Sequence, residues 1–518
     1  MTEIQQTLRA TRLLPHHAAI ALVALMTLVH IALAFVAELG GDEAHYALYG
    51  LMPDWSYFDH PPLVGWLQII PMWLFPSDWG ARIVPIGLYV ALNWLLYRLT
   101  LSLFLALPLR AASSSPASNQ QTEQACSVCD WRGFWSIALL NGTLMFPLMG
   151  FGMLPDDPLL VIVLALVWLV WEMLKTEQAS LKQWLLLGIL VGLAALSKYT
   201  AVTLVVSLLA VLIIEKRWQW LTDKGLWLAV LVALLVISPL IYWNAIHDWA
   251  SFVYQLNHGT HNPDWRLERL LRSQAAQFAV YLPLLFLLGW WMLFARHNYR
   301  SRPHRLLLLF ALPVFALFLW SSGREENLPH WPSLAWLLLI PLVVDWLWQR
   351  RQRLMIRGLV YLQILFSVIL VTLLHSLMFS SWIAFDDHKH PLQGELGWEA
   401  AAQTATELQT QLTNESNPAQ PLPLFVSNWS YASHLTWYVR PQPVYVTTGK
   451  QTQFEFWFGR AAPGMDGLLV VPHYETVPPQ TNRPNRFEQC EPVKTLPIES
   501  KHSIIVSYYF YHCRNYLR

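Results

Sequence analysis

Charged residues are scarce in this chain. Only 13% of its 518 residues are Asp, Glu, Lys or Arg, which is about half the share (~25%) found in soluble domains. This shortage argues against an ordinary soluble protein and indicates that much of the surface faces lipid. The formal net charge is only +1, which argues against a nucleic-acid surface, because such a surface is basic.

Cysteines are also few. Four cysteines cannot form a disulfide scaffold in a chain of this length. Cys490 and Cys513 lie in the polar C-terminal part, where the sequence is compatible with a disulfide or with two free thiols. Cys126 and Cys129 form a lone CxxC, which is half of a zinc site, and we assign it no role.

Long apolar runs dominate the chain instead. Hydrophobic residues make up 55% of the sequence and aromatic residues 14%, with 28 Trp. Runs of about 20 apolar residues cross a bilayer as helices, and their number here predicts eleven spans. The predicted spans are 18–37, 81–107, 134–151, 158–174, 184–196, 200–214, 226–242, 278–294, 306–320, 332–347 and 359–379. The first run lacks a small-residue cleavage pattern, so we expect an anchor and not a removed signal peptide.

The basic residues predict the orientation of these spans. Arg9 and Arg12 precede the first run, which indicates a cytoplasmic N-terminus because positive residues stay inside. With eleven spans, the basic segments 215–217, 296–305 and 349–357 also fall on the inner side. Their agreement with the first pair supports the topology.

Two loops of the helical part have distinct compositions. Residues 110–132 are rich in Ser, Ala and Gln, which predicts a flexible inner loop. Residues 42–75 on the outer side are too polar in their first half to span, and they predict short interfacial helices. The aromatic side chains expected at headgroup depth are Trp55, Tyr57, Trp66 and Trp73.

The chain changes character after Phe379. The patterns PLFVS, PVYVTT, GLLVVPHY and HSIIVSYYFYH predict strands, and residues 398–412 have helical periodicity. We therefore interpret residues 1–380 as a transmembrane domain and residues 381–518 as a soluble α/β domain. An odd number of spans places this second domain on the outer side.

Acidic residues gather where the first span leaves the membrane. GDEAHYALYG and YFDHPPLVGWL hold Asp42, Glu43, His45, Asp59 and His60. Placing carboxylates beside a bilayer costs free energy, so an acidic pair there indicates a functional site. The alternative is that the pair only solvates the end of a helix. The two prolines after His60 fix the backbone, which favours a positioned site.

A set of motifs resembles a known family. In chain order they are DEAHYALYG with YFDHPPLVGWL, PDDPLL, WLLLGILVGLAALSKYTAV, SPLIYWNAIHDWASFVYQL and ENLPHWPSLAW. Together they resemble bacterial polyprenyl-phosphate-sugar glycosyltransferases of the membrane GT-C class, which are related to protein O-mannosyltransferases and lipid A aminoarabinose transferases. The resemblance implies a polytopic α-helical membrane protein of the GT-C fold in the bacterial inner membrane, with a periplasmic α/β domain at its C-terminus.

The resemblance also implies an activity. It is the inverting transfer of a sugar from a polyprenyl-phosphate donor to a hydroxyl or phosphate of lipid A, a protein or an envelope glycan. Asp42 would be the general base, and Glu43 would orient the acceptor or tune the pKa of Asp42. A transporter or flippase of lipid-linked sugars is the alternative, because it would share the spans and the aromatic belts.

The donor phosphate needs positive or donating groups. Lys198 matches a lysine that relatives direct at this phosphate, although a lysine there also snorkels to the interface. His60 stands where the aminoarabinose transferases have lysine, so an imidazole replaces a fixed charge. Asp156, rather than Asp157, matches the family's Pro-Asp-x-Pro motif, and the same position also caps a helix. Further donor or phosphate-binding candidates are Asp59, Tyr46, Arg324 and His330.

Metal and lid candidates carry less weight. Asp42, Glu43, His45 and His60 offer ligands to a divalent cation, but none of them has the helical spacing of a zinc motif, and we assign no metal or other cofactor. His258 and His261 flank a segment that either covers the site or is simply solvated.

Overall fold

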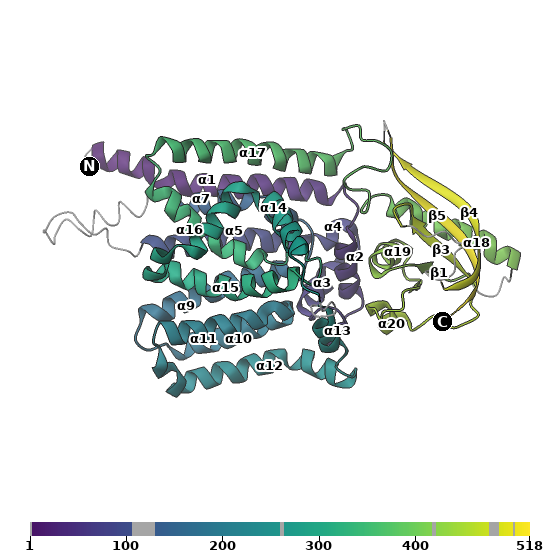
Figure 1. Ribbon diagram of the computed structural model, residues 1–518, viewed down its shortest axis with the longest axis horizontal. Coiled ribbons are helices and arrows are strands. Elements are labelled where there is room, and N and C mark those ends of the chain that lie inside the picture. The colour runs from purple at the N-terminus through teal and green to yellow at the C-terminus, as the bar shows by residue number, and fades with distance from the viewer. Residues whose placement is uncertain are drawn as a thin grey trace.

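The chain forms a bundle of long helices followed by a mixed α/β part (Figure 1). The computed structural model describes residues 3–105, 130–258, 264–416, 421–475, 486–500 and 503–517. The long helices run roughly parallel to one another, and the sheet lies beyond one end of the bundle. We call this end the domain end and the opposite end the far end.

The helices of the bundle coincide with the predicted spans. They are α1 (Glu3–Ala34), α5 (Ile83–Leu105), α7 (Arg132–Asn141), α8 (Met145–Met149), α9 (Asp156–Lys175), α10 (Leu181–Ser197), α11 (Val202–Ile214), α12 (Lys224–Ile246), α14 (Leu267–Phe294), α15 (Arg302–Ser322), α16 (Ser333–Gln349) and α17 (Leu354–Phe379). Seven helices of the described segments are long and apolar enough to cross a membrane. The full count of eleven spans stays a prediction, with the run 134–151 divided between α7 and α8.

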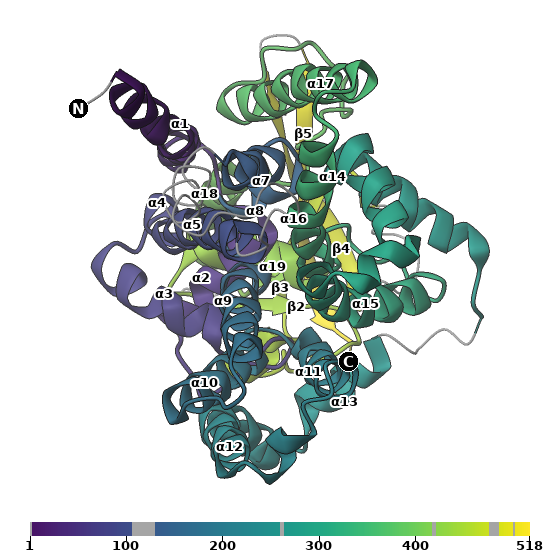
Figure 2. The ribbon, with the colours of Figure 1, turned by 90° about the vertical axis from the view of Figure 1, so that its left-hand side faces the viewer.

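The outer and inner helices bury their side chains differently. On α17 the apolar Leu362, Leu365 and Val368 are each more than half exposed, at 64%, 59% and 59%. Apolar exposure along a whole helix suits lipid as the solvent. In contrast, α16 lies in the middle of the bundle, as Figure 2 shows from the far end, and every residue from Ser333 to Asp345 is buried.

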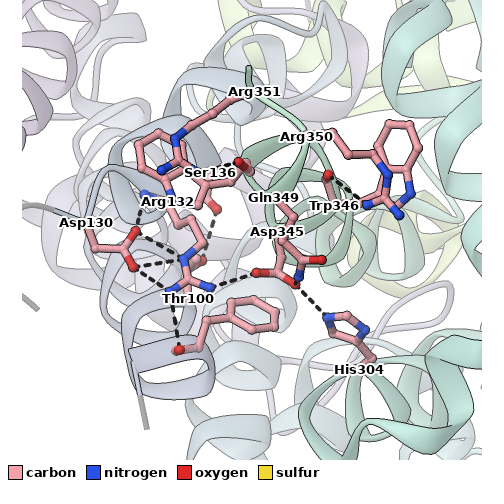
Figure 3. Close-up of polar contacts among 12 residues, drawn as sticks. Thr100, Asp130, Arg132, Ser136, His304, Asp345, Trp346, Gln349, Arg350 and Arg351 are labelled. Carbon is pink, nitrogen blue, oxygen red and sulfur yellow. Dashed lines mark hydrogen bonds and ion pairs between the residues drawn. The ribbon is translucent and has the colours of Figure 1, made fainter. Parts of the chain in front are cut away.

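Buried ion pairs fasten the helices at the far end (Figure 3). Asp345 of α16 accepts hydrogen bonds from Arg132 of α7 (2.7 Å), His304 of α15 (3.0 Å) and Gln349 (2.7 Å). Arg132 also pairs with Asp130 at 2.5 Å. These contacts satisfy a carboxylate that would otherwise be costly in a buried position. The predicted inner loop lies mostly outside the described residues, as do Cys126 and Cys129.

Short helices cover the domain end of the bundle. They are α2 (Gly41–Leu51), α3 (Leu63–Leu74), α4 (Asp78–Ala81) and α13 (Ala250–His258), so the prediction of short helices within residues 42–75 is confirmed. Trp55 and Trp73 are exposed, at 56% and 80%. The headgroup depth of these side chains stays a prediction, but Tyr57 is not exposed on the surface. Its ring is fully buried against Tyr49 at 3.5 Å between centroids, and its hydroxyl donates to the Tyr49 carbonyl oxygen.

The C-terminal part holds a five-stranded sheet in its described residues, in the order β2-β1-β3-β5-β4. The strands are β1 (Leu424–Val426), β2 (Val444–Val446), β3 (Gly467–Pro472), β4 (Phe487–Glu499) and β5 (Ile504–Tyr516). β1 pairs in parallel with β2 and β3, whereas β5 is antiparallel to β3 and β4. A disulfide joins Cys490 of β4 to Cys513 of β5, which decides between the two alternatives for these cysteines.

Polar contacts dock this part onto the domain end of the bundle. The helices of the C-terminal part are α18 (Trp398–Ser416), α19 (Trp429–Val439) and α20 (Gln453–Phe458). Asp78 of α4 accepts hydrogen bonds from the indole of Trp437 (2.7 Å) and the hydroxyl of Tyr438 (2.9 Å). The Glu38 carboxylate accepts from the backbone N–H of Gly397 (3.0 Å) at the start of α18. These contacts hold α19 directly against α2.

Candidate active site

Asp42 lies in the first turn of α2, and the two glycines before it let the C-terminal part approach closely. A Cβ on Gly41 would meet the Ser430 hydroxyl at 2.4 Å and His434 Nε2 at 3.2 Å, so α19 packs where only glycine fits. Among the described residues, no hydrogen bond or ion pair engages the Asp42 carboxylate. Burial, together with the charges of Glu395 and Asp59, raises the pKa of Asp42 to about 6 against the opposing effect of His45 and Lys198.

Glu43, the next residue, turns toward a different partner. Its carboxylate forms a bidentate pair with the fully buried Arg82, with Nε–Oε1 at 2.9 Å and Nη2–Oε2 at 3.0 Å. Arg82 also donates to the carbonyl oxygens of Ala37 and Glu38 at the end of the first span. This geometry favours a structural task for Glu43, which is to fix the start of α2, over contact with an acceptor.

Sequence reasoning missed Arg82 as part of the site. Arg82 stands at the edge of an apolar run, where burying a cation costs free energy unless a carboxylate pairs with it. Its position could therefore have indicated a buried ion pair. Its ring neighbour Phe151 lies 4.2 Å from the guanidinium carbon, so the cation is enclosed on both sides. The sequence alone does not show which carboxylate pairs with Arg82.

His45 connects the first loop to the C-terminal part. Its Nε2 lies 3.0 Å from Asp59 Oδ2, and its Nδ1 lies 3.0 Å from the Ser433 hydroxyl. Ser433 donates its own proton to the Trp429 carbonyl oxygen, so it accepts from Nδ1–H.

Asp59 is held as an anion by this arrangement. Its second oxygen accepts a 2.6 Å hydrogen bond from the Tyr49 hydroxyl. Burial alone would raise the pKa of Asp59, but the neighbouring His45, with the smaller effects of His60 and Tyr49, lowers it. Asp59 is therefore a fixed negative charge that positions His45. Within the described part of the chain, no hydrogen bond or ion pair joins its carboxylate to Lys198 or Arg324.

His60 and Tyr46 are in direct contact. Their rings meet edge to face with centroids 5.6 Å apart, and the buried His60 Nδ1 has no hydrogen-bond partner among the described residues. Burial lowers the pKa of His60 to about 4, and the charge of Lys198 contributes to this shift. His60 is therefore neutral at pH 7, with one nitrogen free for a ligand.

Asp156 and Asp157 have separate roles at the start of α9. Asp157 accepts a hydrogen bond from the Leu154 backbone N–H at 2.7 Å, so it caps the turn. Asp156 accepts a 2.6 Å hydrogen bond from the Lys198 ammonium group, and the two side chains are 3% and 10% exposed. Of the two residues, Asp156 is the one that contacts Lys198; its role in binding the donor stays a prediction.

His330 and Arg324, the second-rank candidates, differ in how they meet this pair. His330 Nε2 lies 3.9 Å from Asp156 Oδ2, and burial lowers its pKa to about 4. The Arg324 guanidinium instead lies over the Trp320 ring at 4.6 Å, and no hydrogen bond or ion pair of the described residues joins its side chain to Asp156 or Lys198. His258 ends α13, and His261 lies outside the described residues.

A metal would find few free ligands here. Among the described residues, no three His, Cys, Asp or Glu side chains gather as a metal site would require. Of the four candidate ligands, Glu43 is engaged by Arg82 and His45 by Asp59 and Ser433. We therefore derive no step through a metal ion.

The remaining groups form two poles at the domain end. One pole is Asp42, a carboxylate that takes up a proton just below neutral pH. The other is Lys198 with His60 and His330. The charge of Lys198 acts on the pKa values of both Asp42 and His60, so the two poles lie within electrostatic reach of each other. Together they can accept a proton at one side and stabilise an anion at the other.

Comparisons with known proteins agree with the resemblance found in the sequence. Residues 127–243 match the family model of dolichyl-phosphate-mannose-protein mannosyltransferases. The chain is 25% identical over 301 residues to the lipid A galacturonosyltransferase RgtD of Rhizobium johnstonii, covering 57% of this chain and 58% of that protein. It is 32% identical over 222 residues to undecaprenyl phosphate-alpha-4-amino-4-deoxy-L-arabinose arabinosyl transferase 1 of Pseudomonas fluorescens, covering 39% of this chain and 37% of that protein.

Solved structures extend the likeness to the whole fold. ArnT from Cupriavidus metallidurans bound to undecaprenyl phosphate matches with a TM-score of 0.57 at 14% identity, over 95% of this chain and 97% of that one. Its apo state matches with a TM-score of 0.55 at 16% identity, over 88% and 93%. The GT-C fold expected from the motifs, with its C-terminal α/β part, is thereby confirmed. The matched region spans less than two thirds of either curated relative.

Proposed function

We propose that this protein is a membrane glycosyltransferase that moves a sugar from a polyprenyl-phosphate donor to an acceptor outside the cytoplasm. Two observations support the proposal. Asp42 has no hydrogen-bond or ion-pair partner among the described residues, and the charge of Lys198, which is paired with Asp156, acts on it at one end of a bundle of the GT-C fold. A base and an anion-stabilising pole are the two parts that this transfer requires.

In the proposed reaction, Asp42 takes the proton of the acceptor hydroxyl. The freed oxygen attacks the anomeric carbon, and the bond from that carbon to the phosphate oxygen breaks with its electrons on the phosphate. The leaving polyprenyl phosphate gains one negative charge, which Lys198 and His60 stabilise. Because attack and departure occur on opposite faces of one carbon, the configuration inverts.

Asp156 orients Lys198 for this task. One of the three ammonium protons is committed to Asp156 at 2.6 Å, so two remain for phosphate oxygens. The pairing also prevents Lys198 from being an uncompensated buried cation. His330 Nε2 lies 3.9 Å from the same carboxylate oxygen, Oδ2, and offers an additional donor.

The names of the relatives suggest which lipids to test first. One relative is named for undecaprenyl phosphate and an aminoarabinose, and the other for lipid A. We therefore propose an undecaprenyl-phosphate-linked sugar as donor and lipid A as the first acceptor to test. The dolichyl-phosphate-mannose-protein family model makes a protein hydroxyl the second acceptor to test.

Transfer of radiolabelled sugar tests the proposal. Membranes or proteoliposomes containing the protein receive a labelled polyprenyl-phosphate sugar and lipid A, and labelled lipid A is quantified. Asp42→Asn should lose roughly 10²-fold or more of the rate, as expected when a general base is removed. A transporter of lipid-linked sugars would instead move label across the bilayer without forming product, and Asp42→Asn would leave that movement largely intact.

The proposed orientation has its own test. We propose that the N-terminus is cytoplasmic and that residues 381–518 lie in the periplasm, so that the pocket opens on that side. Alkaline phosphatase fused after residue 517 should be active in a bacterial inner membrane, because that enzyme requires the periplasm to fold. A fusion within residues 215–217 should be inactive.

A further inference from the structure

Glu395 belongs to none of the motifs described above, yet it lies against the start of α2. It is part of the segment that leads from the bundle into α18. Its Oε2 accepts a 3.0 Å hydrogen bond from the backbone N–H of Gly41, the residue before Asp42. A Cβ on Gly40 would meet the same oxygen at 3.1 Å. The carboxylate therefore caps the first turn of the helix that carries the proposed base.

The surroundings of Glu395 keep it charged and fixed. His434 Nε2 lies 3.5 Å from Glu395 Oε2, and the His434 ring stacks on Trp398 with centroids 4.8 Å apart and planes only 3° from parallel. Burial would raise the pKa of Glu395, but His434 and the Gly41 hydrogen bond lower it. The side chain itself is 53% exposed.

We propose that Glu395 is the positioning residue of the base. It fixes the N-terminus of α2 and holds a negative charge beside Asp42, so that the C-terminal part completes the active site. This inference rests on the proposed function, and it assigns the C-terminal part a task in the chemistry itself. Contact between Glu395 and the reacting atoms is not required.

Glu395 is one of four charged or titratable side chains that affect the pKa of Asp42. His45 of α2, Asp59 of the first loop, Lys198 after α10 and Glu395 all act on its carboxylate. Asp59 is paired with His45 at 3.0 Å, and Lys198 with Asp156 at 2.6 Å. Glu395 is the stronger of the two acids that raise the pKa of Asp42, after burial. Removing its charge should therefore make Asp42 release its proton at lower pH.

Three variants of the full-length protein in proteoliposomes separate charge from geometry. Glu395→Gln keeps a hydrogen-bond acceptor for Gly41 but removes the charge. Glu395→Asp keeps the charge but shortens the reach. Glu407→Gln is the control, because Glu407 is an exposed glutamate of α18 that takes no part in the pocket. The readout is kcat and the donor KM for sugar transfer from pH 5 to 8.5, with thermal unfolding measured for each variant.

We expect the acid limb of the kcat profile to move about half a pH unit lower in Glu395→Gln, since the carboxylate is partly exposed and its effect is screened. The donor KM should stay unchanged. In Glu395→Asp the limb should stay in place while kcat falls roughly tenfold, because the base is held less accurately. Glu407→Gln should match the wild type throughout.

A Glu395→Gln profile that overlays the wild type would overturn the inference. If Glu395→Gln does not fold, Glu395→Asp decides, since a wild-type kcat or a displaced limb in that variant contradicts the positioning role. Failure of the proposed function gives a different result. In that case the wild type and Glu407→Gln form no labelled product at any pH.

Discussion

Lys198 and Asp156 form a 2.6 Å ion pair in which both side chains are at most 10% exposed. The two residues come from the end of α10 and the start of α9, 42 positions apart. The Ser197 hydroxyl reinforces this junction by donating to the Pro155 carbonyl oxygen at 2.7 Å. The lysine is therefore aimed by its partner, and it does not simply extend to the membrane surface.

The first prediction concerns this pair. Lys198→Ala should raise the donor KM at least tenfold, because a charge-assisted contact to phosphate contributes about 1.5–3 kcal/mol. Lys198→Arg should retain part of the affinity, since the charge stays but the geometry changes. Binding of a fluorescent polyprenyl phosphate to the purified protein gives the measurement. Equal affinity of Lys198→Ala and wild type would contradict the phosphate contact.

The second prediction concerns the pH dependence of turnover. The pKa of Asp42 is raised to about 6, and a general base must be deprotonated to act. Activity should therefore be constant above about pH 7 and decline as the pH falls through about 6, by roughly tenfold for each further pH unit. Initial rates at saturating donor between pH 4.5 and 8.5 measure this. A rate that rises on acidification would exclude Asp42 as the base.

The third prediction concerns the Glu43–Arg82 pair. Glu43→Ala leaves the fully buried Arg82 cation without its carboxylate, which should lower the free energy of unfolding by about 3–5 kcal/mol. Thermal unfolding in detergent detects the loss. The double variant Glu43→Leu/Arg82→Met should recover much of it, because no unpaired charge remains. If Glu43 instead orients the acceptor, Glu43→Ala should keep its stability and lose acceptor affinity.

Parts of the site could be predicted from the sequence because they lie in short local motifs. Asp42, Glu43, His45, Asp59 and His60 come from two neighbouring stretches. The first three lie on α2, which begins close to where the first apolar run ends, and the other two lie in the loop that follows α2. The partners of these residues could not be predicted. Glu395 lies 354 positions from Gly41 and Ser433 lies 388 from His45, and only the docking of α19 onto α2 brings them together.

The strands of the sheet could also be predicted only in part from the sequence. Four strands follow from alternating or continuous apolar runs, and all four are present. β4 was missed because its sequence, FEQCEPVKTLPIE, is polar and contains Pro492 and Pro497. It lies at the edge of the sheet, where prolines are tolerated because one side needs no hydrogen bonds. β4 forms a strand because it pairs with β5, although its own composition does not predict one.

The fourth prediction concerns His60, which replaces the lysine of related motifs. Burial lowers its pKa to about 4, so it is neutral at pH 7. A bound phosphate would favour the imidazolium and raise that pKa. Polyprenyl phosphate should therefore bind more tightly as the pH falls from 7 toward 5, with one proton taken up on binding.

The measurement should use the Asp42→Asn background, which prevents turnover and removes the titration of Asp42 itself. Calorimetry in two buffers of different ionisation enthalpy then reports the proton taken up. Adding His60→Gln should abolish the uptake and flatten the pH dependence, whereas adding His60→Lys should give tight binding that no longer varies between pH 5 and 7. Retained uptake in the His60→Gln protein would place the titrating group elsewhere, with His330 as the next residue to replace, because it lies 3.9 Å from Asp156 in the same pocket.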